Sequence, residues 1–244
     1  MSVEVLFFAR IREIVGESRI TVHEGEIRTV ADIWAQVCNR FPQARELEKV
    51  LLFAVNQEFA NMQTRVKAGD EIAIFPPVSG GEKKLEDPIS GTAPEDFFQI
   101  VRTALHIDDL VDQLRCPEDG AIVIFDGIVR NNSLGRKTLY LEYDGYELMA
   151  LKKMKEIGSE IRGKWPINRL GMMHRLGRLE IGEASVIIVV TAAHRKTAFE
   201  ACQYAIDTLK RVVPIWKKEF FEDGEVWIEG EGYPLPRPSE ESQQ

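Results

Sequence analysis

The first 80 residues contain short runs in which apolar and polar positions alternate, a pattern typical of strands with one buried face. Val3, Val5 and Phe7 share one face of a strand predicted over residues 3–8. Three further strands are predicted over residues 19–23, 51–55 and 71–75. These runs predict a small sheet in the N-terminal third of the chain.

One helix is predicted between the second and third of these strands. From residue 30 to residue 41, apolar positions recur at the spacing of a single helix face. Thr29 suits the N-cap, Asp32 follows three residues later as in a capping box, and Pro42 ends the helix. The order strand, strand, helix, strand, strand is the order that a β-grasp domain requires.

The rest of the chain combines longer strands with amphipathic helices. Strands are predicted over residues 97–102, 121–129, 139–143, 170–174 and 185–191. Helices are predicted over residues 107–114, 146–161 and 196–212. A closing hairpin is predicted over residues 216–221 and 225–229, with its turn at Asp223-Gly224. This mixture predicts a second domain of the α/β type.

The stretch between the two patterns is polar and carries proline and glycine, so it predicts a linker. Its twelve residues, 82–93, would reach roughly 40 Å when fully extended. The end of the chain is rich in proline, serine, glutamate and glutamine, which favours disorder. The resulting division has domains over residues 1–81 and 94–233, the linker over 82–93, and a tail over 234–244.

Composition narrows the class of protein. The chain has 244 residues, of which 44% are hydrophobic and 29% charged, as in ordinary globular proteins with two domains. A net charge of −8 argues against general nucleic-acid binding. The longest apolar runs, of about ten residues, are too short to span a membrane, and the N-terminus lacks a signal-peptide core. We therefore expect a cytoplasmic protein with no membrane or nucleic-acid partner.

Cysteine and histidine residues give no sign of a metal site. The three cysteines form no CxxC pair, and their odd number argues against a disulfide framework. His106 and His174 lack neighbouring residues that would complete a zinc site, and no HExxH sequence occurs. We expect no metal and no cofactor.

Cationic residues concentrate in one window of this acidic chain. Residues 194–219 contain six Lys or Arg against three acids. Arg130 follows a strand, and His194-Arg195 lies between a strand and a helix, where backbone N–H groups favour anions. Lys210 and Lys217 are seven residues apart and would share a face if Pro214 did not interrupt the helix. A small anionic ligand fits this pattern, and so does a solvated helix face.

The end of the first domain has an unusual sequence. Pro76 and Pro77 stiffen the exit from the last strand, and Gly80-Gly81 ends a thin arm without side chains. Such an arm could carry a reactive carbonyl into a narrow channel. Gly-Gly followed by Glu-Lys-Lys is also ordinary linker composition.

Three segments of residues 1–81 resemble the small subunit of molybdopterin synthase. They are Phe7-Phe8-Ala9-Arg10-Ile11-Arg12-Glu13, Gly69-Asp70-Glu71 and Pro76-Pro77-Val78-Ser79-Gly80-Gly81. In that family the terminal glycine is adenylated and converted to a thiocarboxylate that supplies sulfur. This chain departs from the family because Gly81 is not terminal and its carbonyl is bonded to Glu82.

Roughly residues 94–230 resemble the large subunit of the same enzyme. The segments that carry the resemblance are Phe125-Asp126-Gly127-Ile128-Val129-Arg130, Leu141-Glu142-Tyr143, His174-Arg175-Leu176-Gly177, Ala193-His194-Arg195-Lys196-Thr197-Ala198-Phe199 and Lys210-Arg211-Val212-Val213-Pro214-Ile215-Trp216-Lys217-Lys218-Glu219. The resemblance implies that Lys210 and Lys217 are catalytic, together with Gly81. It implies anion binding at Arg130, His194 and Arg195, to which we add Lys218.

The two resemblances together imply an α+β protein, with a ubiquitin-like β-grasp domain followed by an α/β hammerhead-type domain. The implied reaction transfers sulfur from Gly81 to cyclic pyranopterin monophosphate, which forms the dithiolene of molybdopterin. The implied partners are an activating enzyme that adenylates and sulfurates Gly81, a protease that cuts behind it, and a second copy bound through the second domain. The alternatives are an unprocessed carrier or interaction fusion with a silent enzymatic half, and a carrier for another sulfur pathway.

Overall fold

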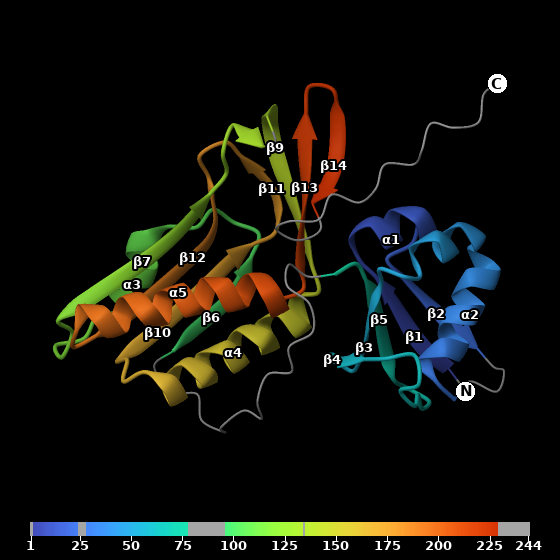
Figure 1. Ribbon diagram of the computed structural model, residues 1–244, viewed down its shortest axis with the longest axis horizontal. Coiled ribbons are helices and arrows are strands. Elements are labelled where there is room, and N and C mark those ends of the chain that lie inside the picture. The colour runs from blue at the N-terminus through green and yellow to red at the C-terminus, as the bar shows by residue number, and fades with distance from the viewer. Residues whose placement is uncertain (1, 24–27, 78–95, 134, 229–244) are drawn as a thin grey trace.

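The computed structural model describes residues 2–23, 28–77, 96–133 and 135–228 (Figure 1). The Gly80-Gly81 arm, the linker and the C-terminal tail of the sequence analysis lie outside these residues. The described chain forms two domains, one on each side of the view in Figure 1.

The N-terminal domain is a five-stranded sheet with the order β2-β1-β5-β3-β4. Its elements are β1 (Ser2–Phe7), α1 (Ala9–Val15), β2 (Arg19–His23), α2 (Val30–Arg40), the 3-10 helix η1 (Pro42–Leu47), β3 (Leu52–Val55), β4 (Glu58–Ala60) and β5 (Glu71–Phe75). The first and last strands, β1 and β5, run parallel at the centre, and the other pairs are antiparallel. This is the β-grasp topology expected from the sequence.

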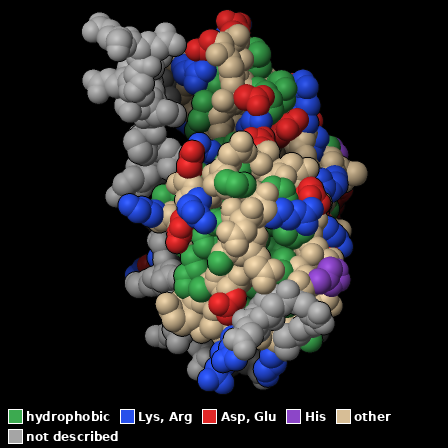
Figure 2. All heavy atoms as spheres, turned by 90° about the vertical axis from the view of Figure 1, so that its right-hand side faces the viewer, with side chains coloured by type: hydrophobic (Ala, Val, Ile, Leu, Met, Phe, Trp, Pro, Cys, Tyr) green, Lys and Arg blue, Asp and Glu red, His purple; other side chains and the backbone are tan. Residues whose placement is uncertain are grey.

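The core of this domain follows from the alternation along β1. Val3, Val5 and Phe7 are almost fully buried and pack with Ile33 and Val37 of α2. The predicted capping box is confirmed, because Thr29 and Asp32 bond reciprocally at the start of α2. The side of the molecule that carries this domain shows acidic and basic side chains interspersed over its described part (Figure 2).

The second domain has two sheets. Its elements are β6 (Phe97–Val101), α3 (Ile107–Leu114), β7 (Ala121–Ile128), β8 (Asn132–Ser133), β9 (Arg136–Gly145), α4 (Glu147–Lys164), β10 (Arg169–Arg175), β11 (Gly177–Glu180), β12 (Ala184–Ala192), α5 (Arg195–Val212), β13 (Ile215–Phe221) and β14 (Gly224–Ile228). One sheet has the order β6-β10-β12-β7, and the other has β11-β9-β13-β14 with β8 beside β9.

Helices cover both faces of the four-stranded sheet, and β12 shows how. Ile188 and Val190 pack against α4 and α5, whereas Ile187 and Val189 pack against α3. A strand buried on both faces needs a nearly continuous apolar sequence, which residues 184–192 provide. Within the described residues, no helix is both long and apolar enough to cross a lipid bilayer.

An apolar cluster joins the two domains. Phe8 of the N-terminal domain stacks on Tyr146 and Trp216 of the second domain, with ring centroids 5.0 and 5.8 Å apart. The indole Nε1 of Trp216 donates a hydrogen bond to the carbonyl oxygen of Pro76, 3.2 Å away. The residue that follows β5 is therefore held against β13, on which the sequence analysis places a catalytic lysine.

A carboxylate of the second domain caps a helix of the first. Asp144 accepts hydrogen bonds from the backbone N–H of Ala9 at 2.8 Å and from Arg12 at 3.0 Å. Ala9 has a φ of 50°, in the left-handed region that non-glycine residues rarely adopt. The residue before it, Phe8, provides no side-chain cap. The start of α1 is thus completed by the other domain.

The predicted strands and helices of both domains are present, and the fold class is confirmed. Strand β9 is longer than expected, and five short elements were not predicted. They are α1, η1, β4, β8 and β11. The fold brings the end of α5 and the strand β13 together beside the four-stranded sheet, and this arrangement forms the candidate site.

Candidate active site

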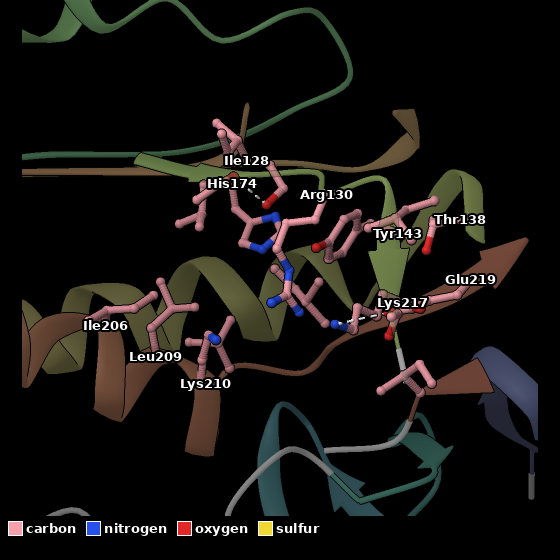
Figure 3. A pocket seen from close by; sticks show the side chains of 18 of the residues that line it. Ile128, Arg130, Thr138, Tyr143, His174, Ile206, Leu209, Lys210, Lys217 and Glu219 are labelled. Carbon is pink, nitrogen blue, oxygen red and sulfur yellow. Dashed lines mark hydrogen bonds and ion pairs between the residues drawn. The ribbon is translucent and has the colours of Figure 1, made fainter. Parts of the chain in front are cut away.

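A pocket of about 380 Å³ opens where the two sheets of the second domain meet the end of α5 (Figure 3). Strands β7, β9, β10, β12 and β13 contribute to its wall, together with the residues that follow β7. Three of the predicted site residues line it, namely Arg130, Lys210 and Lys217. Segments almost ninety residues apart in the sequence, from Arg130 to Lys217, therefore meet in one space.

The two lysines reach the pocket from different elements. Lys210 lies in the last turn of α5, and Lys217 lies on β13. The helix ends at Val212, before Pro214, so the lysines do not share a helix face as a continued helix would have required. The turn between α5 and β13 brings both into the pocket instead, and Figure 3 shows their side chains on the same side of it.

The alternation along β13 decides which side chains face the pocket. Lys217 and Glu219 line it, and the Lys217 ammonium lies 3.3 Å from a Glu219 carboxylate oxygen. Glu219 is buried, and its second oxygen has no hydrogen-bond partner within the described chain. The sequence analysis did not select Glu219, although residues two apart on a strand share a face.

Lys218 does not line the pocket, although the sequence analysis groups it with the residues expected to bind the substrate. It lies on the opposite face of β13 and points toward the N-terminal domain. Its ammonium bonds to Glu13 at 2.8 Å and to Glu225. Burial opposes its charge, but these two carboxylates outweigh that effect and raise the pKa of Lys218. Its position assigns it to the contact between the domains.

His194 and Arg195 are also absent from the described lining of the pocket. Both are exposed at the start of α5, with His194 as the N-cap residue. Lys210 follows His194 by sixteen residues on the same helix, which corresponds to about 24 Å along the axis. One chain therefore cannot bring these residues to the lysine end of the pocket.

The wall opposite the lysines carries His174 and Tyr143. Their rings meet edge to face with centroids 5.2 Å apart, and both residues line the pocket. Burial lowers the pKa of His174 to about 4 and raises the pKa of Tyr143, so both groups are neutral at pH 7. The pocket therefore has a cationic end and a neutral polar end. In Figure 3 the rings of His174 and Tyr143 lie above the guanidinium end of Arg130, and Lys210 and Lys217 lie lower in the view.

The described lining of the pocket has more cationic than anionic side chains. Among the described lining residues, the three cations face Glu219 as the single carboxylate. Such an excess of positive charge, with a planar guanidinium in it, suits a phosphate or carboxylate group. Within the same part of the chain, no group of His, Cys, Asp and Glu side chains could hold a metal ion. Gly81 lies outside the described residues.

Comparison with protein families assigns each half of the chain. The family model described as MoaE protein matches residues 100–212. The ThiS family model matches residues 5–81. The two matches do not overlap and follow the order of the two domains.

Individual relatives match the second domain of the chain. A molybdopterin synthase catalytic subunit from Halalkalibacterium halodurans is 44% identical over 60% of this chain and 97% of its own length. The catalytic subunit from Homo sapiens is 43% identical over 60% of this chain and 73% of its own length. The crystal structure of molybdopterin synthase from Staphylococcus aureus matches with a TM-score of 0.52 and 43% identity, over 54% of this chain and 96% of that one. The chain therefore belongs to the family of molybdopterin synthase catalytic subunits, enzymes of molybdenum cofactor biosynthesis, and carries a ubiquitin-like ThiS domain in the same polypeptide.

Proposed function

We propose that the chain is a sulfurtransferase that makes the dithiolene of molybdopterin from cyclic pyranopterin monophosphate. Gly81, as a thiocarboxylate, supplies the sulfur. The observation that carries the proposal is the meeting of Arg130, Lys210 and Lys217 in one pocket with an excess of positive charge. The domain boundaries of the sequence analysis are part of the proposal, with residues 1–81 as the carrier and 94–233 as the catalytic domain.

The position of the carrier domain supports this reaction. Trp216, which holds the carbonyl of Pro76, is the neighbour of Lys217 on β13. One face of β13 thus contacts the carrier, and the other lines the pocket. Gly81 is the fifth residue after Pro76, a reach of roughly 17 Å when extended.

The chemistry assigns a role to each cation. Arg130 binds the substrate phosphate with its planar guanidinium. The thiocarboxylate sulfur attacks a substrate carbon and forms a thioester while a bond from that carbon to oxygen breaks, and the departing oxygen takes a proton or stays on the phosphate. Water then breaks the acyl–sulfur bond, which leaves sulfur on the substrate and restores a carboxylate at Gly81. Lys210 and Lys217 transfer protons and stabilise the oxyanions that develop. Two sulfurs require two turnovers of the carrier.

Cleavage behind Gly81 is a second part of the proposal. Adenylation needs a free carboxylate, but Gly81 is joined to Glu82 by an amide. A protease that cuts this bond and an activating enzyme that sulfurates Gly81 are therefore the required partners. A cytoplasmic location, where such enzymes would meet the chain, stays a prediction.

The test combines two forms of the protein. Residues 1–81 carrying a thiocarboxylate, mixed with residues 82–244, should convert the substrate to the dithiolene, and a chain made uncleavable by Gly81→Val should not. Because Gly81→Val also alters the arm, a change at Glu82 that blocks the protease is the control. Sulfur transfer by a chain whose mass remains intact would contradict the cleavage. No transfer by either form would favour an interaction protein or a carrier for another pathway.

A homodimer through the second domain is the third part of the proposal. His194 and Arg195 are expected to bind anions but cannot reach the lysines of their own chain. A second copy can supply them. Apolar side chains are exposed on β7 and at the start of α5, and those of Ile124, Ile128 and Phe199 are 41%, 55% and 63% exposed. Ile128 also lines the pocket, so a copy docked on β7 would lie beside the site.

Complementation between variants tests the shared site. Lys210→Ala and Arg195→Ala chains should each have little activity alone. Mixed and allowed to exchange subunits, they should regain about a quarter of the wild-type activity, because half of the dimers then hold one intact site of two. A mixture that stays as inactive as its parts would contradict the contribution of Arg195 from a second copy.

A further inference from the structure

The neutral end of the pocket contains a histidine that the reaction scheme above does not use. His174 lies on β10, is 5% exposed, and lines the same pocket as the lysines. Its ring meets the ring of Tyr143 edge to face. A buried polar ring at the wall of a substrate pocket has two nitrogens whose hydrogen-bonding roles must be accounted for.

The first nitrogen is fixed by the backbone. Nδ1 of His174 lies 3.0 Å from the carbonyl oxygen of Arg175. A carbonyl oxygen only accepts hydrogen bonds, so Nδ1 carries the proton and donates it. In the neutral ring, Nε2 then has a lone pair and can only accept.

The second nitrogen has no partner in the described chain, and the pocket is the space it faces. In Figure 3 the ring projects from β10 above the guanidinium end of Arg130, toward the same space as Lys210 and Lys217. The neutral state is maintained because burial lowers the pKa of His174 to about 4 and three cations line the same pocket. Nε2 therefore presents an acceptor to whatever occupies the pocket.

We propose that Nε2 of His174 accepts a hydrogen bond from an N–H group of the substrate's heterocyclic ring, and that this contact sets which way round the substrate binds. The inference rests on the proposed function, since it concerns the substrate of that site. The cyclic phosphate of the substrate is an anionic acceptor and is repelled by the lone pair of Nε2, so it binds at the end with Arg130, Lys210 and Lys217. The ring N–H groups of a pterin then face His174.

This arrangement makes His174 a specificity-determining residue. Sulfate carries no hydrogen at neutral pH and gains nothing from Nε2, so its affinity is independent of His174. A heterocycle that carries the donor gains a hydrogen bond to a buried ring, and the loss of one such bond typically costs about tenfold in affinity. The two ligands therefore separate the roles of the two ends of the pocket.

A matched pair of substitutions isolates Nε2. An asparagine side chain can keep the donor to the Arg175 carbonyl but ends short of Nε2, whereas a glutamine amide reaches the position of Nε2 and offers an oxygen acceptor there. His174→Asn should weaken the binding of cyclic pyranopterin monophosphate about tenfold and raise KM with a smaller change in kcat. His174→Gln should restore most of that affinity, and neither change should alter the competition by sulfate.

Nitrogen NMR of the wild-type chain provides a measurement that needs no variant. The chain has four histidines, so the Nε2 signal of His174 can be resolved and assigned. It should have the shift of an unprotonated nitrogen and move when the substrate is added, but not when sulfate is added. This inference would be overturned if the wild type and folded His174→Asn bound the substrate equally well, or if the substrate left the Nε2 signal unmoved. Either result would leave the proposed function standing. Failure of the wild type to bind the substrate would overturn the proposed function and this inference with it.

Discussion

Lysine and arginine side chains line both the pocket and the contact between the two domains, but their surroundings differ. At the contact, each cation meets a carboxylate of the other domain. The pairs are Arg12 with Asp144, Lys218 with Glu13, and Lys152 and Lys153 with Glu58. In the described lining of the pocket, Glu219 is the single carboxylate beside Arg130, Lys210 and Lys217, and it pairs with Lys217.

The difference indicates two uses of positive charge. Matched pairs across a contact fix orientation and exclude wrong partners more than they add affinity. An excess of cations around an open pocket is stabilised when an anion enters. The contact cations thus each meet a carboxylate across the contact, whereas the described lining of the pocket has more cations than carboxylates and favours an anionic ligand. Each prediction below tests one side of this comparison.

The largest effect is expected at the pocket lysines. Lys210→Ala or Lys217→Ala should lower turnover by about 100-fold or more, the scale of lost acid–base or oxyanion stabilisation. Lys210 is exposed, so the thermal midpoint of Lys210→Ala should change little, whereas Lys217→Ala leaves the buried Glu219 without its ion-pair partner and should lower the midpoint. Lys155→Ala, an exposed lysine on α4, is the control and should keep normal turnover. Near-normal turnover in well-folded Lys210→Ala would remove the catalytic assignment.

The next effect concerns the neutral histidine of the pocket. The folded pKa of His174 is about 4, below the value of about 6.5 of an unfolded chain, so the unfolded state binds a proton first as the pH falls. Its contribution to stability is complete above pH 6.5 and is lost toward pH 4. The free energy of unfolding should fall by about 2 kcal/mol between pH 7 and pH 5 from this group alone. Nearby groups that share the pocket are Tyr143, Arg130, Lys210, Lys217 and Glu219.

Chemical denaturation at several pH values measures this effect. The wild type should lose more stability than His174→Gln over the same pH range, because the variant has no group that titrates there. The difference between the two curves excludes the contribution of the carboxylates that both chains share. Parallel curves would contradict a buried neutral His174.

A smaller effect is expected at Arg130. Arg130→Ala should raise KM about tenfold, the loss of one charge-assisted contact, and leave kcat within a few fold. The KM of Arg130→Lys should lie between the KM of the wild type and that of Arg130→Ala, because lysine keeps the charge but not the planar guanidinium. Sulfate should compete with the substrate in the wild type and less in Arg130→Ala. An unchanged KM in both variants would place the phosphate elsewhere.

The local features of this fold could be predicted from the sequence because their causes are local. Helix α2 follows from the Thr29 and Asp32 capping box and its apolar face. Helix α5 follows from the stripe of Cys202, Ala205, Ile206 and Leu209, although Phe199, which shares its spacing, is exposed. Helix α1 was missed because its cap is Asp144, which is 135 residues from Ala9 in the sequence. No pattern near Ala9 carries that information.

The candidate site shows the same limit. Arg130, Lys210 and Lys217 were selected by family resemblance, and the fold then brings them together. Glu219 was not selected, although the alternation along β13 places it beside Lys217 and assigns Lys218 to the other face. His174 lies in a segment that carries the resemblance and is weighed as a zinc ligand, but the sequence assigns it no role in the pocket. Its burial and its contact with the Arg175 carbonyl are features of the tertiary structure.

The smallest effect is expected at the contact between the domains, where Lys152 and Lys153 both meet Glu58. Lys152 is 37% exposed and Lys153 is 7% exposed, and Lys153 also bonds to Glu156 at 2.8 Å. Exposed ion pairs contribute between zero and about 1 kcal/mol and are screened by salt, so Lys152→Ala should cost less than about 1 kcal/mol. Lys153→Ala should cost more, because it leaves the largely buried Glu156 without its cation. Unfolding of the whole chain at low and high salt measures both, and the Lys152 effect should vanish at high salt while most of the Lys153 effect remains. The exposed pair would be more than a surface ion pair if the two variants lost equal free energy of unfolding, or if salt left the Lys152 effect unchanged. Either result would weaken the distinction between the charges of the contact and those of the pocket.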